Sequence, residues 1–269
     1  MNPGARVAAV VIAALVLLAM AAPWLSPHGH AFLDWGHLAA PPQLEGSHWL
    51  GTDRLGRDLF ARGMQGLRVS LLIGLVAALV SVIIGVTWGA VAGYLGGRVD
   101  AVMMRFVDIV YALPYVFIVI ILSTMFPRGS LAALVLAIGA VGWLTMARIV
   151  RGQTLSLRRR EFVDAAIVSG VRTPQILWRH IVPNVAGPVI AYATLAIPQM
   201  ILFESFLSFL GLGVQEPYAS LGGLINEGAH EMETSPWMLL VPATLLTVLL
   251  VCFNVLGDAL RARVESRHV

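Results

Sequence analysis

The sequence predicts an all-α membrane protein with six transmembrane helices, and two observations carry this prediction. First, the 269-residue chain is 58% hydrophobic and only 12% charged, whereas a soluble domain carries about 25% charged residues. Second, six separate stretches are long and apolar enough to cross the hydrocarbon core of a bilayer, which takes about 20 residues of helix. A multi-pass membrane protein accounts for both.

The six predicted spans are separated by polar segments of different lengths. We place them at 7–25, 69–95, 101–126, 131–150, 185–210 and 237–256. The first stretch has a second interpretation as a cleaved signal peptide, with Arg6 as its basic start and Ala19-Met20-Ala21 as its cleavage site. We adopt the uncleaved span, because it explains the arginine pattern at least as well.

Arginine placement predicts the orientation, because cytoplasmic loops of membrane proteins carry the excess of basic residues. All 18 basic residues are arginines. With both termini cytoplasmic, thirteen fall inside and five outside; the outer five are Arg54, Arg57, Arg62, Arg68 and Arg128. The net charge of +3 therefore reflects topology, and we expect contact with membrane lipid but no nucleic-acid partner. The predicted location is the cytoplasmic (inner) membrane of a prokaryote.

Three regions follow from this topology. Residues 1–68 comprise the first helix and a Pro-, Gly- and His-rich outer segment. Residues 69–258 form the transmembrane core, which includes a cytoplasmic loop at 151–184. Residues 259–269 form a cytoplasmic tail.

The residue inventory excludes several chemistries. Without any lysine, the chain lacks the residue that P-loop ATPases, Schiff-base enzymes and Ser-x-x-Lys hydrolases require. The single Cys252 allows no internal disulfide. His230-Glu231 begins like a zinc-protease helix, but Thr234 stands where the second histidine belongs. The other histidines show no ligand spacing, so we expect no metal site and no catalytic residues.

Two helix features concern packing. Gly85, Gly89, Gly93 and Gly97 recur at every fourth position of the second span, which places them on one face where a neighbouring backbone can approach closely. This face serves either ordinary close packing or a sliding contact in a transporter. Prolines Pro114 and Pro198 interrupt the third and fifth spans and favour kinks there.

The cytoplasmic loop carries a pattern of two short helices. Phe162, Ala165, Ala166 and Ser169 follow helical spacing and give a small-residue face, and Gly170 stands where the helix should end. A second short helix is predicted to begin at Thr173-Pro174, with Thr173 as its N-cap and with Ile176, Leu177 and His180 on its inner face. The simpler alternative is a pair of interfacial helices that only anchor the loop.

The same loop resembles the EAA motif of ABC importer permeases. Asp164-Ala165-Ala166, Gly170 and Val182-Pro183 fall at the spacing of that motif. Two positions depart from it, because Asp164 replaces the first Glu and His180 stands where Ile is expected. The resemblance implies that this loop docks into an ATPase subunit; the residues it assigns to this coupling are Glu161, Phe162, Asp164, Ala165, Ala166, Gly170, His180 and Pro183.

Three further segments resemble dipeptide, oligopeptide and nickel permeases of the same class. They are residues 48–58 (HWLGTDRLGRD), 207–215 (LSFLGLGVQ) and 254–258 (NVLGD). Departures occur at Trp49 and Glu216, where Pro is usual, and at Leu221, where Trp is common. The resemblance implies the type I ABC importer permease fold and a translocation subunit for peptides or similar small solutes. It implies no cofactor in this chain, since ATP and Mg²⁺ belong to partners.

The implied partners are a second homologous permease, two ATP-binding-cassette ATPases and an extracytoplasmic solute-binding protein.

The sequence also contains two candidate sites. Glu204 lies within the fifth span, where an ionisable group marks a functional site by default, so we assign Glu204, Met200 and Ser205 to the pathway; a structural hydrogen bond is the alternative for Glu204. Asp53, Arg57 and Asp58 form either a structural outer cap or a binding-protein contact.

One function of a different class remains open. A stand-alone proton-coupled secondary transporter would use Glu204 or Asp108 as its relay. Asp108 is otherwise expected to form a helix-end ion pair with Arg105. The substrate itself is not encoded in a recognisable motif.

Overall fold

The computed structural model describes residues 3–43, 46–126 and 129–265. Over these residues the chain forms helices and turns, with one isolated bridge between Thr52 and Asp58 and no extended strand. The elements are α1 (Pro3–Leu25), α2 (Leu59–Leu95), α3 (Gly97–Ala112), α4 (Tyr115–Thr124), α5 (Leu131–Leu157), α6 (Glu161–Val168), α7 (Thr173–Ile176), the π turn η1 (Leu177–Ile181), α8 (Val182–Phe209), α9 (Leu221–His230) and α10 (Trp237–Glu265).

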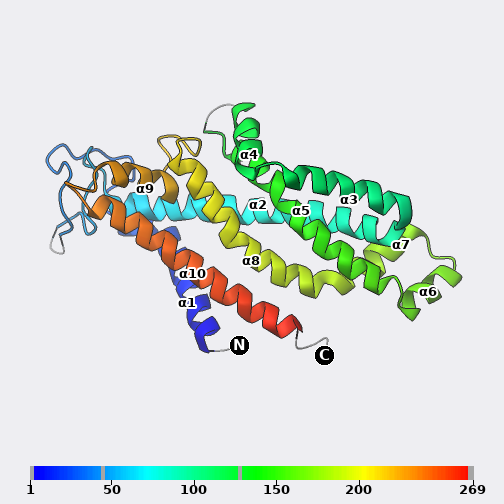
Figure 1. The fold of residues 1–269 in the computed structure, drawn as a ribbon. Helices are drawn as coiled ribbons and strands as arrows, with labels where there is room; N and C mark the ends of the chain where they lie inside the picture. Colours follow the sequence, from blue (N-terminus) through cyan, green and yellow to red (C-terminus); the bar gives the residue numbers. More distant parts are fainter. Residues whose placement is uncertain (1–2, 44–45, 127–128, 266–269) are drawn as a thin grey trace.

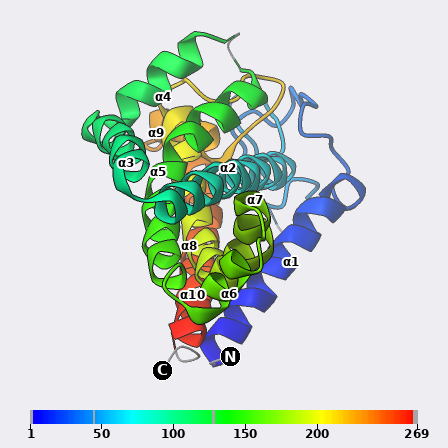
Figure 2. The ribbon, with the colours of Figure 1, turned by 90° about the vertical axis from the view of Figure 1, so that its right-hand side faces the viewer.

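The long helices form an elongated bundle with two distinct ends (Figure 1). One end carries residues 26–43, residues 46–58 and α9, and is called the cap end below. The other carries α6 and α7 and is called the loop end, which faces the viewer in Figure 2. Five helices are long and apolar enough to cross a membrane, or six if the bent pair α3–α4 counts as one span. The prediction of an all-α membrane fold is confirmed.

The second helix begins ten residues before the predicted start at Val69. Asp58 caps it, because its side chain accepts a hydrogen bond from the Ala61 N–H at 2.7 Å. The hydropathy pattern concealed these first turns because Arg62, Gln65 and Arg68 are polar. In the structure Arg62 is 3% exposed and its charge is neutralised by acidic partners.

The predicted third span is broken. Helix α3 begins at Gly97 and ends at Ala112, and the axis turns by 92° before the α4 segment. Pro114 explains the break, because a residue that precedes proline is forced out of the helical region, and Leu113 is extended with ψ 141°. Pro198 acts differently, since α8 continues through it to Phe209.

Helices α2 and α5 pack along each other more extensively than any other pair. The glycine face of α2 allows this contact. A Cβ atom at Gly85 would lie 2.6 Å from the Met146 Cβ, and one at Gly89 would clash with the Ala147 carbonyl oxygen. Gly97 does not belong to this face, because α2 ends at Leu95 and a Cβ at Gly97 would meet nothing within 4 Å. The structure therefore shows close packing at Gly85 and Gly89.

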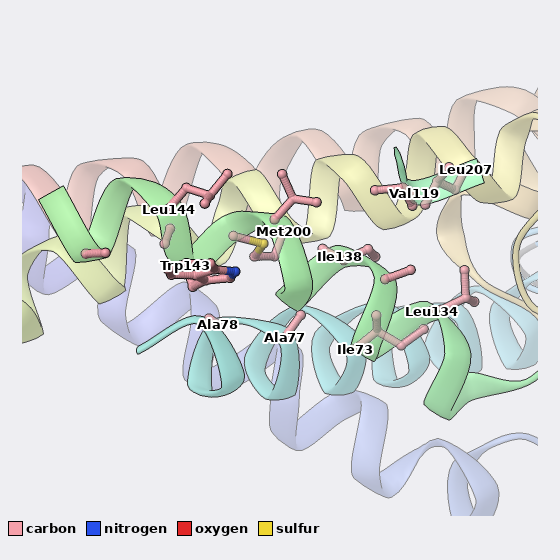
Figure 3. Close-up of a cluster of buried hydrophobic side chains, with 14 of the residues drawn as sticks. Ile73, Ala77, Ala78, Val119, Leu134, Ile138, Trp143, Leu144, Met200 and Leu207 are labelled. Atoms are coloured by element: carbon pink, nitrogen blue, oxygen red, sulfur yellow. The ribbon is translucent and has the colours of Figure 1, made fainter. Parts of the chain in front are cut away.

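The main core lies between α2, α5 and α8, with Val119 of α4 at its edge (Figure 3). Apolar side chains fill it; the largest fully buried ones in this cluster are Ile73, Leu134, Ile138 and Leu144. Helix α1 packs outside, against α10 and α2. The beginning of α1 and the end of α10 lie near each other in both views (Figures 1 and 2).

Several helices extend past their predicted ends. Helix α5 continues from residue 150 to Leu157, and α10 continues through the predicted tail to Glu265. The predicted outer link 211–236 contains α9, which Ser220 caps by accepting the Gly223 N–H at 3.3 Å. Arg128 and Arg267, both counted in the arginine pattern, lie outside the described residues.

Candidate functional site

A cavity of about 340 Å³ lies between α3, α5 and α8, beside the break at Leu113–Pro114. Its wall combines apolar side chains with hydroxyl and amide groups. The lining residues are Val110, Tyr111, Leu113, Val141, Gly142, Leu144, Thr145, Tyr192, Ala196, Gln199, Met200 and Phe203. A mixed wall of this kind suits a small solute that carries both apolar and hydrogen-bonding groups.

An arginine stands beside this cavity. The Arg148 guanidinium carbon lies 4.2 Å from the centre of the Tyr111 ring. Arg148 Nη2 also donates to Asp108 Oδ1 at 2.8 Å. The expected partner of Asp108 was Arg105, one turn away on the same helix. The structure corrects this, because α5 brings Arg148 of a different helix to Asp108.

The three residues assigned to the pathway separate in the structure. Met200 lines the cavity and belongs to the main core. Glu204 and Ser205 are not among the lining residues; Glu204 is fully buried and Ser205 is 4% exposed.

Glu204 lies among serines contributed by several elements. Its Oε2 accepts a hydrogen bond from Ser70 Oγ of α2 at 2.6 Å, and its Oε1 accepts one from Ser208 Oγ at 2.7 Å. Ser70 Oγ in turn accepts the Leu221 N–H at 3.3 Å. Glu204 thus joins α8 to α2 and, through Ser70, to the start of α9, which is the structural alternative given for it above.

The loop end presents α6 with one buried and one exposed side. Val163 and Ala166 are buried and belong to an apolar cluster that also contains residues of α2, α5, α7, η1 and α8. Most of the residues assigned to coupling lie on the other side or in the adjoining turns, and the exposed ones are Glu161, Phe162, Asp164, Ala165, Gly170 and Pro183. Ala166 is the exception, and His180 is only partly exposed. The side chains of Ile167 and Val168 add exposed apolar surface.

The end of α6 follows the predicted pattern. Gly170 adopts φ +74°, the Gly170 N–H donates to the Ile167 carbonyl at 2.9 Å, and the Val171 N–H donates to the Ala166 carbonyl at 3.0 Å. These two bonds are a Schellman cap, which favours glycine at the left-handed position. The following helix begins one residue earlier than predicted, because Arg172 rather than Thr173 is the N-cap.

Helix α7 does not end as a separate element. It passes through the π turn η1 directly into α8. Leu177 and Ile181 of this turn are buried in the same cluster as Val163 and Ala166. The buried side of α6 thus shares an apolar cluster with a continuous helical rod whose far part lines the cavity.

At the cap end, Asp53 is fully buried and accepts hydrogen bonds from two arginines. Arg57 Nε and Arg62 Nη1 each donate to Asp53 Oδ2 at 2.6 Å. Arg62 also makes two hydrogen bonds to Glu227 of α9, at 2.6 and 2.9 Å. Arg57 donates to Glu216 Oε1 at 2.6 Å. This ionic cluster joins the start of α2 to the link between α8 and α9.

The predicted cap set of Asp53, Arg57 and Asp58 is therefore split. Asp58 faces His48, with its Oδ2 3.0 Å from His48 Nδ1, rather than the arginines. Arg62 and Glu227 also belong to the cluster, but their 165-residue separation leaves no local signal in the sequence.

Comparisons with known proteins agree with this architecture. Residues 85–267 match the family described as binding-protein-dependent transport system inner membrane component. Residues 1–42 match the N-terminal TM domain of oligopeptide transport permease C. A solved structure of the MetNI methionine ABC transporter covers 73% of this chain and 94% of its own, with a TM-score of 0.61 at 17% identity. That likeness supports the predicted type I importer permease fold.

Full-length relatives are more similar in sequence. The oligopeptide transport system permease protein OppC of Escherichia coli K12 is 52% identical over 99% of this chain and 88% of the relative. OppC of Haemophilus influenzae is 48% identical over 99% and 85%. The dipeptide permease DppC of Bacillus subtilis is 40% identical over 94% and 78%.

These relatives are permease subunits and not ATPases, so a stand-alone proton-coupled carrier is no longer needed as an alternative. They belong to multi-pass inner-membrane components of bacterial transport systems that work with a binding protein and an ATPase. By sequence and by fold, this chain belongs to the binding-protein-dependent transport system inner membrane component family.

Proposed function

We propose that this chain forms one half of a peptide pathway, with a second homologous permease as the other half. The cavity between α3, α5 and α8 is the part of the pathway that this chain contributes. The peptide class comes from the names of the relatives, OppC and DppC. It is supported by the mixed wall of the cavity, where Gln199, Tyr111 and Thr145 offer hydrogen-bonding groups beside apolar side chains.

The loop end is proposed to face the cytoplasm and to dock one of two ATPase subunits, which bind ATP and Mg²⁺. The observation that carries this proposal is that α6 has an exposed side, while its buried side shares an apolar cluster with a helical rod that runs from α7 to α8. Closure of the ATPases would draw α6 inward, and the buried contacts of Val163 and Ala166 would transmit this displacement to α8. Alternating access of the cavity follows from that motion.

The cap end is proposed to face the outside and to receive the solute-binding protein. Asp53 is fully buried, so it organises the cap and is not itself a contact. Glu216 is the exposed member of the ionic cluster, with 64% of its side chain accessible. We therefore assign the contact with the binding protein to the surface around Glu216.

Copurification tests the coupling proposal. A tagged chain is extracted gently from native membranes, and its partners are identified by mass spectrometry. We expect a second permease and ATPase subunits with the wild-type chain. Ala165→Trp should abolish recovery of the ATPases, because Ala165 is exposed on α6. Gly170 is a poorer probe, since its positive φ makes any substitution strain the loop itself.

The matched control is Ala132→Trp, at an exposed alanine in the first turn of α5. It should retain all partners. Equal recovery of ATPases with Ala165→Trp and Ala132→Trp would exclude α6 as the docking helix. Recovery of the wild-type chain alone in several mild detergents would contradict the proposed assembly as a whole.

A further inference from the structure

Four polar side chains meet at the cap end, apart from the ionic cluster. Asp34 Oδ2 lies 2.9 Å from His37 Nδ1 and 3.3 Å from His48 Nε2. One ligand atom from each of Asp34, His37 and His48 lies within 4.8 Å of the other two. The other nitrogen of His48, Nδ1, lies 3.0 Å from Asp58 Oδ2.

We propose that Asp34, His37 and His48 bind a divalent transition-metal ion, for which Zn²⁺ is the best match. Two imidazoles and one carboxylate are a ligand set that zinc takes in proteins, with a fourth position left for water. Ligand atoms in a tetrahedral zinc site lie roughly 3.3 Å apart, given bonds of about 2.0 Å. The two contacts of Asp34 are already near that separation.

Neighbouring side chains hold one of the ligands in position. A metal-bound histidine usually donates its other ring N–H to a carboxylate, which fixes the tautomer and the ring orientation. For His48 that carboxylate is Asp58, whose Oδ2 lies 3.0 Å from His48 Nδ1. Asp58 is itself held because its Oδ1 accepts the Ala61 N–H at 2.7 Å. The His28 ring stacks on His48 with centroids 4.6 Å apart, which further restricts the imidazole plane.

The backbone around the ligands is fixed independently of any metal. The Asp34 N–H donates to the Gly56 carbonyl at 3.3 Å, and the Ala39 N–H donates to the Asp53 carbonyl at 2.8 Å. Gly56 has φ +77°, and a Cβ there would overlap the Asp34 carbonyl oxygen. The chain thus turns back on a glycine so that the residues near Asp34 lie against the start of α2.

The exposure of the ligands also suits a metal ion. His37 is exposed while His48 is 4% exposed, so the site opens to solvent on one side only. A bound ion would join residues 34–37 to His48 and, through Asp58, to the first turn of α2.

Metal uptake by the full-length chain tests the proposal directly. The chain is purified in detergent with a tag that contains no histidine, stripped with chelator, and dialysed against Zn²⁺. Metal content is then measured by mass spectrometry. A parallel titration with Co²⁺ reports tetrahedral coordination through its visible absorption. We expect one Zn²⁺ per chain and a higher melting temperature with Zn²⁺.

Two ligand variants and one control complete the test. His37→Gln and Asp34→Asn should weaken Co²⁺ binding roughly tenfold or more, the range known for less direct changes at zinc sites. Both positions are partly or fully exposed, so the fold should survive, as circular dichroism will show. His230→Gln, at an exposed histidine of α9, should bind like the wild type. Binding that is absent in the wild type, or unchanged in both ligand variants, would overturn the proposal.

Discussion

Arg57 Nη1 lies 2.6 Å from Glu216 Oε1, although the two residues are 159 positions apart in the sequence. Arg57 precedes α2 by two residues, and Glu216 follows α8 by seven. The ion pair therefore fixes the link after α8 to the start of α2. Since α8 lines the cavity and α2 packs along α5, this contact bears on how freely the cap end can open.

The first prediction concerns the pH dependence of this contact. The hydrogen bond from Arg57 lowers the pKa of Glu216. The ion pair between Arg57 and Glu216 therefore stabilises the fold fully above the unfolded-state pKa of Glu216, about 4.3. This stabilisation is lost as the pH falls through the lower pKa of Glu216 in the folded state. Glu216→Gln should lower stability at pH 7 by less than about 1 kcal/mol, because the carboxylate is mostly exposed.

Thermal unfolding in detergent at several pH values measures this effect. The melting temperatures of wild type and Glu216→Gln should converge as the medium becomes acidic. A gap of constant size at pH 7 and in acid would show that the carboxylate charge is not responsible.

The second prediction is a much larger loss at Asp53. This carboxylate is fully buried and accepts hydrogen bonds from Arg57, Arg62 and the Leu55 N–H. Its removal leaves two nearly buried guanidinium groups without their shared acceptor. We expect Asp53→Ala to cost about 3–5 kcal/mol, the range for breaking a buried ion pair. Glu231→Ala is the control, because its partner Arg54 is exposed and 3.9 Å away, so the substitution should change little.

The same thermal unfolding assay compares these two variants at neutral pH. Similar small losses at positions 53 and 231 would mean that solvent screens the cap more than its burial indicates.

The third prediction uses two glycines in α2 and α5. A Cβ at Gly89 would clash with the backbone of α5, at the Ala147 carbonyl and the Arg151 nitrogen, so Gly89→Ala should destabilise by about 1–3 kcal/mol. Gly152 lies inside α5, and a Cβ there meets nothing within 4 Å. Gly152→Ala should therefore stabilise by about 0.5–1 kcal/mol through helix propensity. In thermal unfolding we expect Gly89→Ala to lower the melting temperature and Gly152→Ala to raise it. A Gly89→Ala variant as stable as the wild type would contradict the close contact between α2 and α5.

These residues show what the sequence can and cannot predict. Local signals located Gly170 as the end of α6, the glycine face of α2 and the break at Pro114, because each depends on neighbours within a few positions. The hydropathy pattern did not predict the true start of α2, because Arg62 there is neutralised inside the protein by Asp53 and Glu227, which no local pattern reveals. The spacing of the histidines likewise did not predict that His48 lies beside Asp34, because the turn at Gly56 brings the two residues together.

The fourth prediction separates the two roles considered for Glu204. Its hydrogen bonds to Ser70 and Ser208 place it in a buried polar contact outside the cavity lining. Glu204→Gln retains one side-chain oxygen that can accept a hydrogen bond from a serine hydroxyl, so transport should continue. Glu204→Leu leaves the serine hydroxyls without their acceptor and should destabilise by about 1–3 kcal/mol.

Peptide uptake and thermal unfolding together read out these variants. A complete loss of uptake in Glu204→Gln at normal stability would indicate instead that the carboxylate takes part in transport, and would revive the pathway role for this residue.

The last prediction tests the cavity as the pathway. Thr145 lines it from α5 and is partly exposed there, so Thr145→Trp should fill much of the roughly 340 Å³ space. Peptide uptake should fall to a small fraction, while the amount of chain in the membrane and its recovery with partners stay unchanged. Thr247→Trp is the control, because Thr247 is an exposed threonine in the middle of α10 and away from the cavity. It should transport like the wild type. Equal uptake by both variants would mean that peptides cross elsewhere, and the second permease would then have to supply the pathway.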